Sequence, residues 1–326
     1  MSPRVSILMP VFNVAPFLRE AMDSILNQTY QDFELIVLND CSPDNSEEIL
    51  DSFSDSRIVR YLGEENVGLA NVLNIGLKMA KGEFIARMDS DDISLPMRLE
   101  KQVSYLDAHP EVDLVSAGMQ RFGDSERIIS YTTDFEEVKF NAMSFSPLLH
   151  ASSMWRRKRF LDKELFYRQE MVPSEDYDLW ARALAKRLVL VNIPDVLYGY
   201  RTHAAQVTCT NKNWEKNCEI GFRYIESVFP GISKEQTSQF FYLRTFKDPR
   251  KVKMVCQDLE KENRKVGFIN PRYLHNKLKR YYQGRLYEQM KTEGIKWSLV
   301  FDLRVIQLFR LLIGRIHDKR SNTAVQ

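Results

Sequence analysis

Three carboxylates fall within four residues, at Asp89, Asp91 and Asp92, and form the cluster of this 326-residue sequence most able to bind a cation. Carboxylates this close together repel one another at neutral pH unless a cation or hydrogen-bond donors compensate. Hard oxygen ligands suit Mg²⁺ or Mn²⁺, and such ions commonly keep a substrate phosphate as a further ligand. The alternative is an acidic surface turn or helix start, and the Asp-x-Asp spacing alone does not decide between the two.

The cluster follows one of several short β-rich runs that alternate with helical patterns. The apolar run Val5–Met9 ends at Pro10, and Glu34–Leu38 ends just before Asp40. This order predicts an α/β fold, a mostly parallel twisted sheet flanked by helices, in which ligands bind beyond the carboxyl ends of strands. Pro10, Asp40 and Asp89–Asp92 should therefore meet at one edge. Further strands are expected at 57–61, 83–88 and 112–117, and helices at 17–26, 46–53, 69–80 and 174–186.

Composition divides the chain into two parts. Apolar residues make up 44% of it, enough for a sizeable core, and the net charge is +2. The first 200 residues carry an excess of acidic side chains and the remainder an excess of basic ones. We predict a catalytic domain over 1–210 and a helical extension over 211–326. The basic extension either meets phosphates, an anionic membrane surface or a partner, or is a solvated helical surface.

Six segments of the sequence resemble, in order, the motifs of family 2 glycosyltransferases of the GT-A fold. The resemblance covers roughly the first 210 residues, and six motifs in the family's order are far more specific than one. The segments are MPVFN (9–13), SILNQTYQDFELIVLNDCSPDNS (24–46), NVGLANVLNIGL (66–77), GEFIARMDSDDISLPMRLEKQ (82–102), SEDYDLWAR (174–182) and YRTHAAQVT (200–208).

The resemblance implies a nucleotide site at the first two strands. Pro10, Phe12 and Asn13 match positions that meet the nucleotide; the family often has Tyr at Phe12, so ring stacking survives and a hydroxyl is lost. Asp40 matches the carboxylate that contacts the nucleobase, typically a uracil imide N–H, through a charge-assisted hydrogen bond. A turn-forming aspartate is the alternative there. Asp89 should lie beside the ribose or the water shell of the metal.

The resemblance also implies a metal site, for Mn²⁺ or Mg²⁺. Asp91 is the expected ligand, and His203 either ligates the metal or touches the diphosphate, with Arg201 beside it. A structural histidine is the alternative. Arg87 is expected to pair with the acidic cluster, and Arg98 either does the same or caps a helix.

The expected catalytic base is Asp176, in Ser174-Glu175-Asp176, because a base must be a carboxylate within reach of the acceptor hydroxyl. Acidic residues also favour helix N-termini, and both roles can hold together. Adjacent residues of a helix point about 100° apart, so Glu175 should face a neighbouring donor or solvent. The implied reaction is inverting transfer of a sugar from a nucleotide diphosphate, expected to be UDP, to a saccharide or lipid-linked saccharide in cell-surface polysaccharide assembly.

Other classes fit the residues less well. A nicotinamide oxidoreductase needs a glycine-rich turn where Pro10–Asn13 stands, and a P-loop protein needs a Walker motif that the sequence lacks. Nucleic acid is not an expected partner. The remaining alternative is a catalytically inactive relative that binds sugar nucleotides or serves as a scaffold.

The location of the protein is expected to be cytoplasmic. Four cysteines show no disulfide or zinc spacing, and the N-terminus lacks the features of a secretory signal. Ile295–Ile316 is mostly apolar, but charged residues interrupt it and argue against a membrane span. It is either an ordinary core helix or a helix at the inner face of the plasma membrane, which would make the protein a peripheral one.

Overall fold

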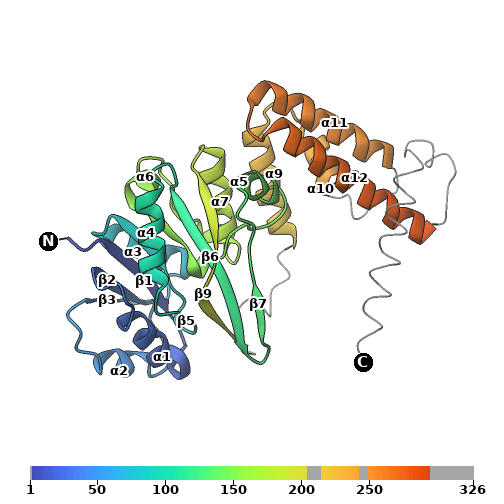
Figure 1. Cartoon of the computed structure of the whole chain (residues 1–326). Coiled ribbons are helices and arrows are strands. Elements are labelled where there is room, and N and C mark those ends of the chain that lie inside the picture. Colours follow the sequence, from blue (N-terminus) through green and yellow to red (C-terminus); the bar gives the residue numbers. More distant parts are fainter. Residues whose placement is uncertain (1, 204–213, 242–248, 294–326) are drawn as a thin grey trace, which may run out of the picture.

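The computed structural model describes residues 2–203, 214–241 and 249–293. The strands are β1 (Val5–Val11), β2 (Phe33–Asn39), β3 (Ile58–Leu62), β4 (Phe84–Arg87), β5 (Ile93–Ser94), β6 (Leu114–Gly123), β7 (Arg127–Ile129), β8 (Met154–Arg156) and β9 (Leu190–Thr202). The described strands form one sheet in the order β3-β2-β1-β4-β8-β6-β9-β5, with β7 paired to β6 (Figure 1).

The α/β class is confirmed, and the sheet has two parts. Strands β3, β2, β1 and β4 are mutually parallel, as the alternation of strands and helices predicts. Beyond β4 the sheet is mixed, because β8 lies antiparallel between β4 and β6 while β6 and β9 run parallel. The long β6–β9 pair carries the chain toward Thr202 and so brings the end of β9 next to the turn that follows β4.

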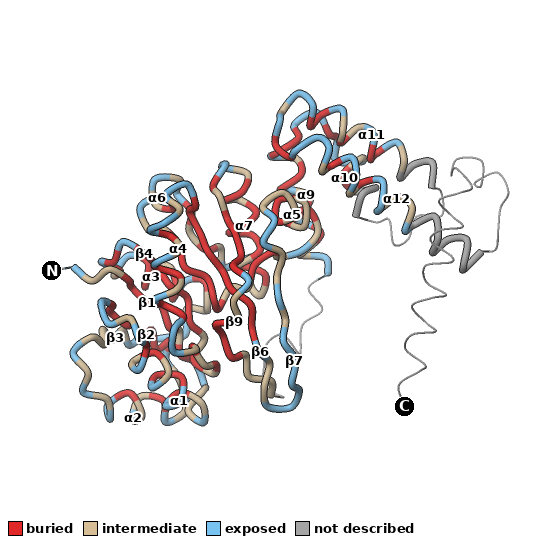
Figure 2. The backbone as a smooth tube through the Cα atoms, in the orientation of Figure 1, coloured by how far each residue is buried: buried red, intermediate tan, exposed pale blue. Residues whose placement is uncertain are grey.

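Helices cover both faces of the sheet, since successive strand residues point to opposite sides. Leu8 joins the core cluster that contains Leu73, whereas Ile7 and Met9 join the cluster that contains Leu18. Figure 2 shows the central strands of the sheet as buried. The helices are α1 (Ala15–Leu26), α2 (Ser46–Asp51), α3 (Leu69–Met79), α4 (Arg98–Ala108), α5 (Phe135–Asn141), α6 (Arg157–Leu161), α7 (Glu175–Ala185), α9 (Trp214–Val228), α10 (Lys234–Phe241), α11 (Pro249–Val266) and α12 (Pro271–Glu293), with short 3-10 turns at η1 (His150–Ser152) and η2 (Gln169–Met171).

The described part of the predicted extension packs against the domain. In α9 the Tyr224 hydroxyl donates to the carbonyl of Lys139, which is in α5, at 3.1 Å. The Lys139 ammonium in turn donates to the carbonyl of Phe268, between α11 and α12, at 2.6 Å. The α11–α12 pair projects from this end of the molecule (Figure 1). The predicted boundary at residue 210 and the apolar stretch Ile295–Ile316 lie outside the described residues.

No helix in the described part of the chain is both long and apolar enough to cross a membrane.

Arg98, at the start of α4, is fully buried and does not ion-pair with the acidic cluster. Its guanidinium donates to the carbonyls of Arg87 at 2.6 Å and Ser153 at 3.5 Å, and its Nε to the side chain of Gln102 at 3.1 Å. Burial lowers its pKa to about 10. Arg98 therefore joins α4 to the last residue of β4 and to the segment before β8.

We expect Arg98→Ala to lower the free energy of unfolding by about 3 kcal/mol or more, because it leaves buried carbonyls without donors and opens a cavity. Lys101→Ala, one turn further on, removes a partly exposed ion pair with Asp195 and should cost about 1 kcal/mol or less. Denaturant titration of both variants measures the difference. Equal losses would contradict the role given to Arg98.

Candidate active site

The acidic turn between β4 and β5 rests on a buried arginine. Arg87 is 1% exposed, and its guanidinium pairs with the Asp89 carboxylate at 2.6 Å. The backbone N–H of Asp89 donates to the hydroxyl of Tyr198, on β9, at 3.1 Å. Burial raises the pKa of Tyr198 well above its usual value, so its hydroxyl keeps its proton. The carboxylate of Asp89 remains partly exposed and accessible to a ligand.

Asp91 and His203, the two predicted metal ligands, lie side by side. His203 Nε2 is 3.1 Å from Asp91 Oδ2, and the imidazole packs on the Phe17 ring of α1 with centroids 4.6 Å apart. Burial and the nearby Asp89 carboxylate raise the pKa of Asp91, which is the situation that a bound cation relieves. A carboxylate and an imidazole suit Mn²⁺, and a carboxylate suits Mg²⁺.

No cluster of three or more such ligands occurs among the described residues. A divalent cation at Asp91 and His203 would therefore complete its coordination with phosphate oxygens and water, as Mg²⁺ commonly does.

Arg201, on β9, fastens the acidic turn in place. Its backbone N–H donates to Asp92 at 2.7 Å, and its Nε donates to the carbonyl of Asp91 at 2.8 Å. Its guanidinium also pairs with Glu20 of α1, a partner that carries no sequence signal. Asp92 is buried, and burial together with Asp89 and Asp91 raises its pKa. Arg201 and Asp92 thus shape the turn while Asp91 faces His203.

Asp176 lies in the first turn of α7 and is partly exposed. Its carboxylate accepts a hydrogen bond from Ser146 at 3.2 Å, and desolvation raises its pKa to about 6. Tyr131 lies within electrostatic reach of it. Neither Ser146 nor Tyr131 belongs to a motif, so no sequence pattern singles them out. A carboxylate with a raised pKa that a ligand can approach is suited to accept a proton near neutral pH.

Glu175 faces a neighbouring imidazole and not solvent, which is one of the two surroundings expected for it. It is 5% exposed and points inward rather than to solvent, and its Oε1 lies 4.0 Å from Nδ1 of His150. Its other oxygen has no hydrogen-bond partner among the described residues. Burial, then the neighbouring Asp176 carboxylate, raises its pKa to about 7. His150 is itself held by the Tyr167 hydroxyl at 2.8 Å.

The acidic turn and the start of α7 form one electrostatic cluster. Asp89 raises the pKa of both Glu175 and Asp176, while Arg87 lowers the pKa of Glu175. Such mutual effects require that the groups lie near one another. Asp89 of the acidic turn and the candidate base therefore lie within electrostatic reach of each other, and buried Arg87 interacts with both Asp89 and Glu175.

The candidate nucleotide residues lie at the ends of β1 and β2. Asp40 is buried, and its two carboxylate oxygens accept hydrogen bonds from the backbone N–H groups of Val67 and Gly68, each at 2.9 Å. Gly68 has φ of 87°, a conformation that favours glycine. Asp40 thus holds the loop before α3, and each oxygen keeps a lone pair for a further donor.

Phe12 and Asn13 follow β1, and Pro10 lies within it. The Phe12 ring is 48% exposed, so it is free to stack on a base. Asn13 has φ of 55°, and its N–H donates to the Ser42 hydroxyl at 3.3 Å, which joins the two loops that follow β1 and β2.

Comparison with known proteins identifies the family and the fold. The model of the family described as glycosyl transferase family 2 matches residues 6–170. An uncharacterized glycosyltransferase of Rickettsia typhi is 32% identical over 251 residues, covering 73% of this chain and 74% of that protein. One from Rickettsia felis is 30% identical over 254 residues, covering 74% of this chain and 42% of that longer protein.

Two solved structures share the fold. Staphylococcus aureus TarS 1–349 in complex with UDP-GlcNAc has a TM-score of 0.60 and 16% identity, with 90% of each chain covered. The mannosyltransferase PcManGT from Pyrobaculum calidifontis, in complex with GDP-Man and Mn²⁺, has a TM-score of 0.52 and 16% identity, with 90% of this chain and 87% of that one covered. The fold is therefore of the GT-A type.

Proposed function

Because the chain belongs to glycosyl transferase family 2, we propose that it is an active, metal-dependent, inverting glycosyltransferase. The donor is a nucleotide diphosphate sugar, UDP-linked by preference, and the acceptor is a hydroxyl of a saccharide or lipid-linked saccharide. The observation that carries the proposal is the Asp91–His203 pair in one site with Asp176, a carboxylate whose pKa burial raises toward neutrality.

In this mechanism Asp91 and His203 would hold Mn²⁺ or Mg²⁺, and Asp89 would lie beside the ribose or the water shell of the metal. When bound, the cation would neutralise charge on the departing diphosphate. Arg201 and Arg87 keep the acidic turn in position through the contacts described above. The Mn²⁺ in the PcManGT structure supports a metal on this fold.

Asp176 acts on the acceptor. Its carboxylate takes the hydroxyl proton while the acceptor oxygen forms a bond to the anomeric carbon, and the bond from that carbon to the diphosphate oxygen breaks. The nucleotide diphosphate leaves with the electron pair. Attack from the face opposite the diphosphate inverts the anomeric configuration in a single step, so no covalent intermediate with the protein is required. Base catalysis of this kind contributes about 10²–10⁴-fold in rate.

A catalytically inactive relative that only binds sugar nucleotides is the second candidate. The presence of Asp91, His203 and Asp176 together favours turnover, since a binding protein has no use for a base with a raised pKa. Metal-dependent release of UDP from a UDP-sugar distinguishes the two. A place in cell-surface polysaccharide assembly in the cytoplasm, with peripheral contact at the inner membrane face, completes the proposal. The excess of basic residues after residue 200 supports that contact.

We expect the rate constant for transfer to fall as the pH drops through about 6, because the protonated Asp176 carboxyl cannot accept the acceptor proton. The pKa is raised above the usual value, so activity is present above this pH and lost below it. Steady-state rates at saturating donor and acceptor, from about pH 5 to 8, locate the pH at which the rate falls. A fall centred near the ordinary aspartate pKa would contradict the effect of burial.

Asp40→Ala tests which nucleobase the site prefers. If Asp40 contacts the uracil imide, the change should weaken UDP binding about tenfold, the worth of one charge-assisted hydrogen bond, and GDP binding much less. Calorimetry with both nucleotides in Mn²⁺ gives the two affinities. Since Asp40 also accepts from Val67 and Gly68, an equal loss for both nucleotides would assign it to the loop alone.

A further inference from the structure

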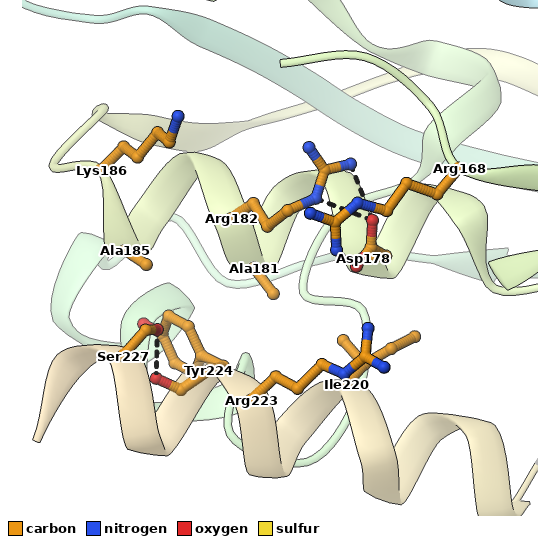
Figure 3. Close-up of a pocket in the computed structure, with 10 residues that line it drawn as sticks. All are labelled: Arg168, Asp178, Ala181, Arg182, Ala185, Lys186, Ile220, Arg223, Tyr224 and Ser227. Atoms are coloured by element: carbon orange, nitrogen blue, oxygen red, sulfur yellow. Dashed lines mark hydrogen bonds and ion pairs between the residues drawn. The ribbon is translucent and has the colours of Figure 1, made fainter. Parts of the chain in front are cut away.

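A cavity of about 330 Å³ lies between α7 and α9 (Figure 3). Its volume is within the range of roughly 300–1,000 Å³ typical of small-ligand sites. Asp178 lines it and follows Asp176 by two residues, so the two carboxylates point about 200° apart around α7. The cavity therefore lies on the opposite side of α7 from the proposed base, and its ligand is independent of the acceptor.

Positive charge dominates the lining of this cavity. Four cationic side chains, Arg168, Arg182, Lys186 and Arg223, line it together with a single carboxylate, Asp178. Asp178 is buried, and its carboxylate accepts a hydrogen bond from Arg182 Nε at 2.8 Å. One cation thus neutralises the one acid, and three remain.

The remaining cations are weakly compensated. Arg168 lies 3.5 Å from Asp178, and its guanidinium makes no hydrogen bond to the rest of the described chain. Arg223 pairs with Glu219 one turn away on α9, but both side chains are about half exposed, and such pairs are worth little. Lys186 donates to the carbonyl of Lys163, a neutral group. The positive charge of these three side chains favours the binding of an anion in the cavity.

The shape of the cavity places the donors on both of its walls. Figure 3 shows Arg168 and Arg182 converging on Asp178 at one wall, with Arg223 on the helix opposite. Ile220 and Tyr224 of α9, each 1% exposed, form an apolar floor. Guanidinium groups present parallel N–H donors that match phosphate oxygens.

We propose that the cavity between α7 and α9 binds a phosphate group, held chiefly by Arg168 and Arg223. The phosphate comes from a free phosphate compound or from a lipid headgroup, and the chemistry of recognition is the same. Because Arg168 precedes α7 in the catalytic domain and Arg223 belongs to the extension, the bound phosphate bridges the two parts of the chain.

The test uses the full-length protein in EDTA, which removes metal-supported phosphate binding at the active site. Calorimetry with inorganic phosphate and sedimentation with vesicles of phosphatidylglycerol in phosphatidylcholine are the two arms. The test variant is Arg168→Gln/Arg223→Gln. The matched control is Lys158→Gln/Arg159→Gln, which removes the same two charges from exposed side chains of α6 outside the cavity.

We expect the test variant to bind at least tenfold more weakly than wild type, while the control binds as wild type does. The loss should appear with inorganic phosphate if the ligand is free, and with vesicles alone if it is a headgroup. If the double variant is less stable than wild type, Arg223→Gln alone replaces it in both binding measurements, because Arg223 is about half exposed. Absence of wild-type binding in both arms, or an equal loss in the test and control variants, would overturn the proposal.

Discussion

Asp176→Asn should cut the rate of sugar transfer about 100-fold or more and leave donor and metal affinity nearly unchanged. Asparagine keeps the size of the side chain and can still accept the hydrogen bond from Ser146, 3.2 Å away in the native protein. It cannot take the proton of the acceptor hydroxyl. Transfer rates and calorimetric affinities for UDP in Mn²⁺, measured on the same preparation, separate the two effects.

The neighbouring acid provides the control. Glu175→Gln should cost much less than Asp176→Asn, because Glu175 is buried and points toward His150 rather than to the exposed side of the α7 start. Both variants remove one negative charge from the same cluster, so a general electrostatic effect would reduce both rates alike. If Glu175→Gln proved the more damaging, the base would be Glu175 and the assignment of Asp176 wrong.

Asp91→Ala should weaken UDP binding in Mn²⁺ by at least about tenfold, since even residues that only orient metal ligands cost 10- to 100-fold when changed. The change leaves His203 as the one remaining ligand of the pair. Calorimetry in Mn²⁺ and again in EDTA measures the metal-supported part of the affinity. The fold should persist, because the change leaves in place the Asp91 carbonyl through which Arg201 holds the turn.

Two comparisons make this result specific. Asp162→Ala removes an exposed carboxylate of the α6 end, paired with Lys158, and should leave UDP affinity in Mn²⁺ unchanged. In EDTA, Asp91→Ala and wild type should bind UDP equally. An Asp91→Ala protein with wild-type affinity in Mn²⁺ would remove Asp91 from the metal site.

The pairing of Asp91 with His203 shows which part of the candidate metal site could be predicted from sequence patterns and which part could not. Periodicity placed the acidic cluster at a strand end, and the structure has it after β4. Nothing in the spacing of the chain predicts that a histidine 112 residues later lies 3.1 Å from Asp91. That expectation came from the family resemblance, and the physical cause is the long β9 strand, which returns beside β6 and β5 to the acidic turn.

Other parts of the site could not be predicted, for reasons that the structure makes plain. Strand β8 has three residues, too few for an apolar period to reveal, yet its antiparallel insertion changes the order of the sheet. Glu20 and Ser146 act through single contacts with Arg201 and Asp176, and isolated polar residues carry no pattern. Arg98 is fully buried, a position that no pattern in the sequence predicts because arginine is rarely buried.

Metal-dependent sugar transfer at this site is tested by the release of UDP from UDP-sugars by the purified protein in Mn²⁺, with EDTA and the Asp91→Ala protein in parallel. We expect release in Mn²⁺ from at least one UDP-sugar, and its loss both in EDTA and in Asp91→Ala. Release that is equally fast in EDTA, or no release from any nucleotide sugar although UDP binds, would mean that the protein is not a metal-dependent glycosyltransferase.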